Sequence, residues 1–247
     1  MSDTQTDKEM NIVGHLSELR NRLIITGLFF IIFFIIGFIY IKEIYGFFEN
    51  DIDFQLTITS PGDIIRIYIT IAGIIGIVGT LPVLCLQLWL FIKPALSKSE
   101  RRVSLSYIPA VFFLFLIGLV FGYFMFIKLI LPFLLSLNDG TFNELFTVDK
   151  YFRFLFQITV PFALLFEIPV IIMFLTSLGI LSPSFLRKMR KYAYFVLLIV
   201  GALVTPPDIF LQLAVAIPLF ILYEISIYLS AIVEKKKLRR HKEYMEE

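Results

Sequence analysis

Cysteine is nearly absent from this sequence of 247 residues, which contains only Cys85. A single cysteine excludes a disulfide within the chain, and its place in a long apolar run favours a packing role. Histidine is almost as scarce, because His15 and His241 are the only two, and neither has metal ligands beside it in the sequence. Walker-type loops and the HExxH and GxSxG motifs are also missing. We therefore expect no metal, no cofactor and no conventional enzyme activity.

Charged residues are few, at 17%, whereas hydrophobic residues make up 58% of the chain and include 28 phenylalanines. The mean hydropathy of +0.87 exceeds that of a soluble domain of this length. Four uninterrupted apolar runs are each close to the roughly 20 residues that cross about 30 Å of hydrocarbon as a helix. These runs are 23–41, 64–86, 105–127 and 154–178. The sequence predicts an all-α integral membrane protein, surrounded by membrane lipids and without a nucleic-acid partner.

The last hydrophobic block, residues 192–232, is interrupted by Thr205-Pro206-Pro207-Asp208. Two prolines and a carboxylate stop a helix, so the block predicts a hairpin of two spans. Its first arm, 191–204, rises only about 21 Å and underspans a normal bilayer. On length alone that arm also fits a re-entrant segment.

The distribution of charge favours six spans. Lysine and arginine gather in the N-terminal arm, in the 91–104 and 179–192 loops and in the tail, whereas the intervening loops are acidic. The positive-inside rule then places both termini in the cytoplasm. We expect a cytoplasmic amphipathic arm (1–22), a single six-helix transmembrane domain (23–232) and a basic cytoplasmic tail (233–247). The first apolar run is long enough to span and lacks a small-residue cleavage site, so we interpret it as an anchor.

Two acids near the predicted cytoplasmic face are candidate binding residues. Glu18 lies on the polar side of the arm, and Glu100 lies in a basic loop between two spans. Each also has a purely structural interpretation. Glu18 can pair with Arg22 four residues on, and Glu100 can complete a capping box with Ser97 at the start of the third span.

A third acid, Glu167, falls near the middle of the fourth span, where an ionisable side chain costs roughly 2.5–3.5 kcal/mol on insertion scales. Asp208 and Gln212 lie one helical turn apart at the outer start of the sixth span. If the two spans are neighbours, the three side chains form a polar patch within the membrane. An internal hydrogen-bonded pair or a protonated acid is the alternative.

Several motifs together resemble the TatC family, the multi-span subunit of the twin-arginine protein translocase. The resemblance extends from His15 to about Ser230. It is carried by HLSELRNRL before the first span, the Ser60-Pro61 pair, QLWLFIKPALSKSERR after the second span, LFEIPV around Glu167, and TPPDIFLQLAVAIPL. The resemblance implies a concave, glove-like bundle with short fifth and sixth spans.

The resemblance also implies a function: a plasma-membrane receptor for twin-arginine signal peptides that exports folded proteins using the proton-motive force. Carried over by position, Glu18 and Glu100 receive the arginine pair, while Phe91, Pro94 and Arg20 shape or orient that site. The patch at Glu167, Asp208 and Gln212 would receive a partner helix. The implied partners are single-span subunits of the TatA type and further copies of the chain.

Two other classes of function remain open from the residues themselves. A proton-coupled secondary transporter would use Glu167 and Asp208 as a proton relay, although no repeat at fixed spacing supports the inverted symmetry of many carriers. A structural membrane scaffold would use Glu18 and Glu100 only as helix-end features.

Overall fold

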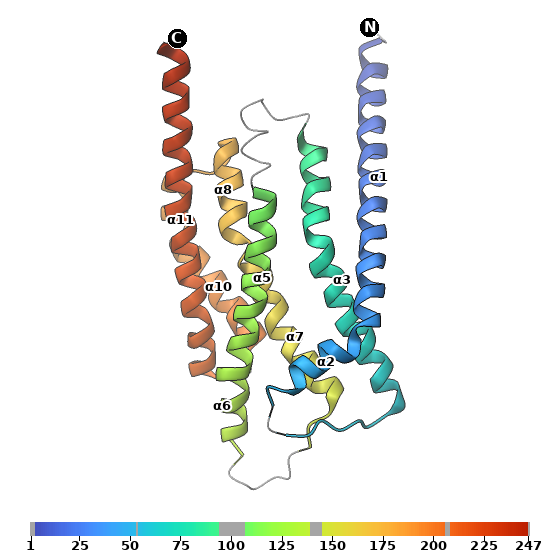
Figure 1. Ribbon diagram of the computed structural model, residues 1–247. Helices are drawn as coiled ribbons and strands as arrows, with labels where there is room; N and C mark the ends of the chain where they lie inside the picture. The colour runs from blue at the N-terminus through green and yellow to red at the C-terminus, as the bar shows by residue number, and fades with distance from the viewer. Residues whose placement is uncertain (1–2, 53, 94–106, 139–144, 206–207, 247) are drawn as a thin grey trace. The chain divides into compact units, whose positions relative to one another are not determined.

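The computed structural model describes residues 3–246 except 53, 94–106, 139–144 and 206–207 (Figure 1). The described backbone is helical apart from turns, loops and one isolated parallel bridge between Thr57 and Thr147. Among the described residues, five segments are long and apolar enough to cross a membrane: Leu16–Ile39, Pro61–Phe91, Tyr107–Ser136, Val148–Leu178 and Ile209–Arg239. With the shorter helix α10 they make the six expected helices. The chain forms two compact units, residues 1–50 with 64–108 and residues 51–63 with 109–247.

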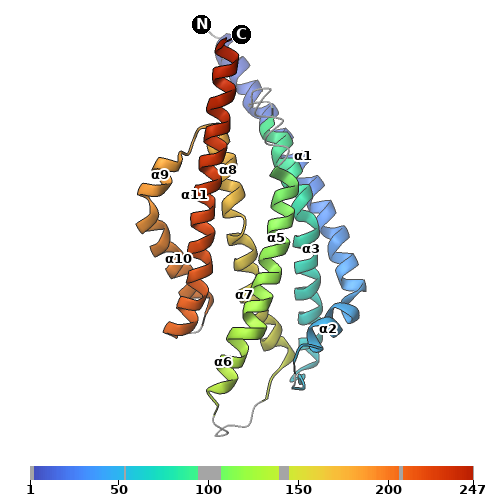
Figure 2. The ribbon, with the colours of Figure 1, turned by 60° about the vertical axis from the view of Figure 1, so that its left-hand side comes forward.

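The first unit consists of α1 (Asp3–Ile39), α2 (Ile41–Glu49) and most of α3 (Pro61–Ile92). Helices α1 and α3 run antiparallel (Figures 1 and 2). Glycines lie where the two helices are in close contact. A Cβ added at Gly37 would meet the Ala72 backbone at 3.1 Å, and one at Gly76 would lie 2.8 Å from the Phe30 ring. Small residues let the two backbones approach closely, as is common between membrane helices.

The N-terminal arm is not a helix of its own. Helix α1 continues from Asp3 to Ile39 without a break, so the arm forms the first turns of the helix that carries the first span. No proline lies between the arm and the span, and the pair between Glu18 and Arg22 supports the helix up to the expected boundary at residue 22. The amphipathic pattern alone does not produce a helix end.

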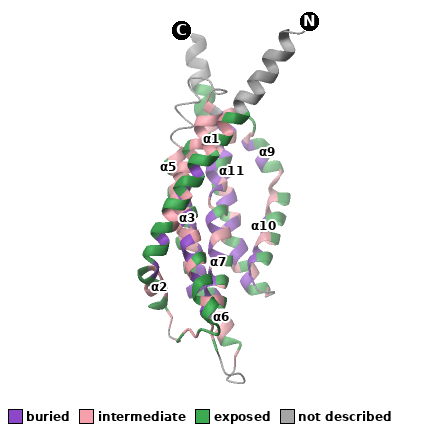
Figure 3. Ribbon diagram, turned by 90° about the vertical axis from the view of Figure 1, so that its right-hand side faces the viewer, coloured by how far each residue is buried: buried purple, intermediate pink, exposed green. Residues whose placement is uncertain are grey.

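The second unit contains a core of buried aromatic side chains. Helix α5 (Tyr107–Met125), the π-helical segment η2 (Phe126–Ile130) and α6 (Leu131–Ser136) form one continuous rod, and α7 (Val148–Leu165) runs antiparallel to it. Gly118 and Gly122 lie against the backbones of Ala163 and Thr159 on α7. The largest buried side chains are Phe115, Phe126, Phe152 and Phe162. Buried residues are coloured purple in Figure 3.

The fourth span is two helices rather than one. Helix α7 ends at Leu165, and α8 (Ile168–Leu178) begins after two intervening residues, Phe166 and Glu167. Pro169 has no N–H to donate to the Leu165 carbonyl, so the helical ladder is interrupted there. Helix α8 ends at Gly179, whose φ of 82° is the left-handed conformation of a helix C-cap.

The last two spans form the expected hairpin. After α9 (Pro183–Lys188), α10 (Arg190–Val204) packs antiparallel against α11 (Ile209–Glu246). The short fifth span is confirmed, because α10 has 15 residues. Helix α11 has 38 residues because it continues through the basic tail, so its length does not measure the sixth span. The tail contains no proline or glycine and is rich in lysine, arginine and glutamate, which are strong helix formers. The concave shape stays a prediction.

Candidate functional site

The first candidate site lies at the N-terminal end of the first span, where Glu18 is paired. Arg22 donates from Nε to Oε1 of Glu18 at 3.1 Å, and its terminal Nη2 donates to the same oxygen. The Arg22 side chain is 20% exposed and that of Glu18 is 36% exposed. The expected pair between these residues is therefore present, and a guanidinium already occupies the Glu18 carboxylate.

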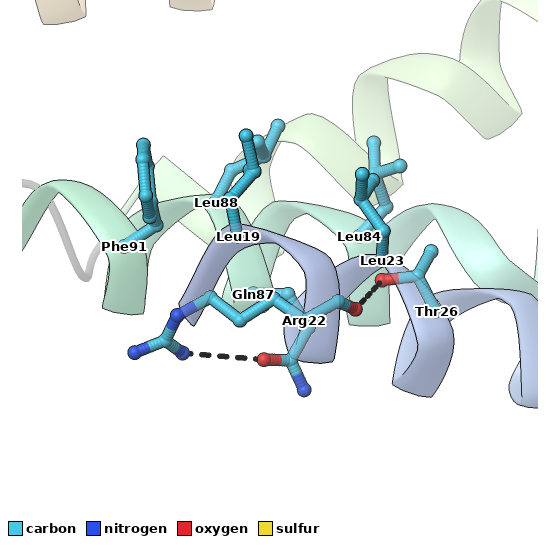
Figure 4. A pocket seen from close by; sticks show the side chains of 8 residues that line it. All are labelled: Leu19, Arg22, Leu23, Thr26, Leu84, Gln87, Leu88 and Phe91. Carbon is cyan, nitrogen blue, oxygen red and sulfur yellow. Dashed lines mark hydrogen bonds between the residues drawn. The ribbon is translucent and has the colours of Figure 1, made fainter. Parts of the chain in front are cut away.

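Arg22 also connects α1 with α3. Its Nη1 donates to Oε1 of Gln87 at 3.3 Å, and the Thr26 hydroxyl donates to the Arg22 carbonyl at 2.9 Å. Figure 4 shows both contacts at the edge of a small pocket of about 20 Å³. Its lining is apolar except for these polar groups, and consists of Leu19, Arg22, Leu23, Thr26, Leu84, Gln87, Leu88 and Phe91. The pocket thus combines an apolar floor with a charged rim beside Glu18.

The other residues assigned to this site are only partly described. Phe91 lines the pocket, and Arg20 is exposed on α1. Glu100 and Pro94 lie outside the described residues, as does the capping box with Ser97. At the end of α3, the Lys93 ammonium lies 5.2 Å from the centroid of the Trp89 ring, a cation–π contact.

The second candidate site lies at the break between α7 and α8. Glu167 is the residue before α8, with φ −77° and ψ −17°, so the break places its carboxyl group within a membrane span. The residue is 7% exposed, and neither carboxyl oxygen has a hydrogen-bond partner among the described residues. A buried carboxyl without a partner costs free energy, and such a group in a native structure calls for an explanation.

Asp208 and Gln212 do not supply that partner. Asp208 Oδ1 accepts from the Leu211 amide at 2.9 Å and so caps the start of α11, while Gln212 donates to the Leu198 carbonyl of α10 at 3.4 Å. The described contacts therefore use both side chains within the hairpin. The Thr205 hydroxyl donates backward to the Gly201 carbonyl of α10 at 3.0 Å.

Sequence reasoning missed the strongest polar network of the second unit. Glu224 accepts from Arg190 at 2.6 Å and from the Tyr194 hydroxyl at 2.5 Å, which joins α10 to α11. The hairpin itself carried the signal, because Arg190 and Glu224 lie nearly equal numbers of residues before and after the turn at 205–208. Antiparallel helices bring such positions level with each other.

The arrangement at Glu18 suits ionic recognition. Within the described ranges, no group of three or more histidine, cysteine or acidic side chains could hold a metal ion. Glu18 presents a carboxylate in a setting that already accepts a guanidinium. Planar guanidinium groups match carboxylates through parallel hydrogen bonds, which ammonium groups cannot form.

Comparison with known proteins agrees with the motifs. The sequence model of the Sec-independent protein translocase protein (TatC) family matches residues 14–218. The chain belongs to the TatC family. It is 46% identical over 232 residues to the Sec-independent protein translocase protein TatCd of Bacillus subtilis, covering 94% of this chain and 96% of that protein. It is also 40% identical over 249 residues to TatC of Halalkalibacterium halodurans, covering 98% of both chains.

Solved structures of the family share the fold. A crystal structure of the twin-arginine translocase receptor TatC superposes with a TM-score of 0.76 at 34% identity, covering 89% of this chain and 99% of that one. A structure of the receptor in the detergent DDM gives a TM-score of 0.77 over 87% and 99%. This TatC chain is therefore a multi-pass membrane protein with the receptor's helical fold.

Proposed function

We propose that this TatC chain is the signal-peptide receptor and core subunit of a twin-arginine translocase in the plasma membrane. Both termini would face the cytoplasm, since the basic arm, loops and tail all lie on that side in the six-span arrangement. The chain would export folded proteins with energy from the proton-motive force. Family membership supports the assignment to a translocase, and the contacts of Glu18 support the role of signal-peptide receptor.

The observation that carries the proposal is the guanidinium already bound to Glu18. Arg22 reaches that carboxylate through two donors. A signal-peptide arginine placed there would make the same kind of contact, and the second arginine of the pair would go to Glu100. Phe91, Pro94 and Arg20 would shape the surroundings of the two acids, and nearby basic residues would hold anionic lipid headgroups.

Peptide binding tests this assignment. We would measure binding of a twin-arginine signal peptide and its twin-lysine version to the purified chain, and to Glu18→Gln and Glu100→Gln. Each variant removes one charge and keeps a hydrogen-bonding side chain. We expect each to weaken arginine binding at least tenfold, since charge-assisted pairs are roughly twice as strong as neutral ones. Glu9→Gln, on the same helix, is the matched control, and equal loss in all three variants would contradict the assignment.

A second part of the proposal concerns Glu167. Its two carboxyl oxygens lack partners among the described residues, although the residue is buried within a span. We propose that a polar side chain of a partner helix, from a TatA-type subunit, satisfies it. Asp208 and Gln212 would contribute by fixing the neighbouring hairpin, through their bonds to Leu211 and Leu198.

Export assays separate this site from peptide binding. Glu167→Ala should reduce export and partner assembly while leaving signal-peptide affinity nearly unchanged. Gln157→Ala is the matched control, because Gln157 lies on α7 of the same span with an exposed side chain. Normal export at a normal level of the Glu167→Ala chain would exclude the partner role.

A further inference from the structure

Arg22 is placed to compete with the ligand of its own chain. Its guanidinium donates twice to Oε1 of Glu18 and once to Gln87 on α3. Its side chain is less exposed than that of Glu18, so the acid is the more accessible partner of the pair. The chemistry of this contact, guanidinium on carboxylate, is the chemistry proposed for the incoming peptide.

We propose that Arg22 is an internal occupant of the Glu18 site, which a signal-peptide arginine must displace. This inference rests on the proposed function of Glu18. In the empty receptor, Arg22 satisfies the acid; in the bound receptor, the peptide guanidinium takes its place. Gln87 keeps a hydrogen bond to Arg22 after the exchange, so the displaced guanidinium stays on the α3 side.

The contacts indicate that displacing Arg22 from Glu18 costs little free energy. Glu18 and Arg22 are four residues apart on one helix and partly exposed, a geometry in which ion pairs are weak. The Thr26 hydroxyl holds the Arg22 carbonyl, not its side chain, so the guanidinium moves without disturbing the helix. While Arg22 occupies Glu18, no other cation can bind there. The apparent affinity for every cationic ligand of Glu18 is therefore the intrinsic affinity multiplied by the fraction of time that Glu18 is free of Arg22.

This occupancy has a measurable consequence. Removing the occupant should strengthen binding of the twin-arginine and twin-lysine peptides by the same factor, about two- to threefold for a pair of this strength. The ratio between the two affinities should not change, because either peptide displaces the same internal group. A residue that orients Glu18 for the peptide would have the opposite effect, since its loss would weaken binding.

The experiment is peptide titration by fluorescence anisotropy with the full chain, Arg22→Gln and Arg22→Lys. Arg22→Lys keeps the positive charge but loses the forked contact, which separates occupancy from simple charge repulsion. We expect both variants to bind more tightly, with Arg22→Gln above Arg22→Lys. In a Glu18→Gln background the gain from Arg22→Gln should vanish, because there is no acid left to occupy.

The outcomes are distinguishable. If the unaltered chain prefers arginine but neither variant binds more tightly, the inference is wrong and the proposed function stands. A gain that persists in the Glu18→Gln background, or that is absent in Arg22→Lys, is a charge effect and also overturns it. If the unaltered chain shows no arginine preference, the proposed function fails, and the inference fails with it. Melting temperatures of all variants check that each one is folded.

Discussion

Glu18 and Glu167 are both acids at proposed binding sites, but the chain treats them in opposite ways. Glu18 lies at the end of a span, partly exposed, and Arg22 satisfies it from one turn away. Glu167 lies inside a span, 7% exposed, and its oxygens find no partner in the part of the chain that the structure describes. One acid is internally neutralised, whereas the other is held without compensation.

This difference teaches how each site relates to stability. A weak, exposed pair is easily exchanged and contributes little to folding. A buried acid without a partner lowers the free energy of unfolding. Only a partner outside the described contacts offsets this cost. A site with such a buried acid is less stable in the isolated chain and becomes more stable when a partner binds. The two acids should therefore respond differently to substitution, and four measurements test this.

The largest effect should come from the packing that fixes Glu167. A Cβ at Gly118 would lie 2.7 Å from the Ala163 Cα and 2.9 Å from the Phe166 Cβ, next to the helix break. Gly118→Ala should lower the free energy of unfolding by about 1–3 kcal/mol through overpacking. Thermal unfolding in detergent measures it. Gly73→Ala is the control, because its added Cβ meets nothing within 4 Å and should stabilise α3 slightly. Equal melting temperatures for the two variants would mean that α5 and α7 are not tightly packed here.

The next effect concerns Glu224, the satisfied acid of the second unit. Glu224→Leu removes the acceptor of both Arg190 and Tyr194. We expect a loss of about 1–2 kcal/mol, near the upper end for polar contacts between membrane helices. Glu224→Gln keeps one acceptor oxygen and should lose less. If Glu224→Leu melts at the same temperature as the unaltered chain, the network contributes nothing to the hairpin.

The sequence predicted the helices better than it predicted their ends and contacts. Apolar runs identified four spans because a bilayer sets their length, and the distribution of charge predicted that the last block contains two more. The end of α11 was not predicted, because the boundary between apolar and charged residues is not a helix stop, and neither was its cap by Asp208. Hydropathy has no information on such local hydrogen bonds.

The candidate residues show the same division. Proximity on one helix predicted the pair of Glu18 with Arg22. The contact of Arg22 with Gln87, and that of Glu224 with Arg190, depend on which helices lie side by side. A single sequence does not show which helices pack side by side. The expected patch around Glu167 also assumed that two spans are neighbours. Helices α8 and α11 are in contact, while the described bonds of Asp208 and Gln212 stay within the hairpin.

Substituting the buried acid should have the opposite sign to substituting Glu224. Glu167→Met replaces an unsatisfied carboxyl group by an apolar side chain of similar length. We expect a gain of about 1 kcal/mol in the purified chain, because the cost of burying the carboxyl is removed. Glu167→Gln should bring less, since an amide without partners is also costly when buried. A lower melting temperature for Glu167→Met would show that Glu167 makes a stabilising contact within the chain.

The smallest effect should come from Glu18. Glu18→Gln removes one exposed ion pair on α1, so the free energy of unfolding should change by less than about 0.5 kcal/mol. Added salt should reduce even that difference, because exposed charges are screened. The same variant should lose most of its arginine-dependent peptide binding. Thermal unfolding at low and high salt, beside the peptide titration, measures both quantities. If Glu18→Gln lowered the melting temperature as much as Glu224→Leu, Glu18 would be a structural acid. The pair of Glu18 with Arg22 would then not be easily exchanged, and the contrast with Glu167 would be lost.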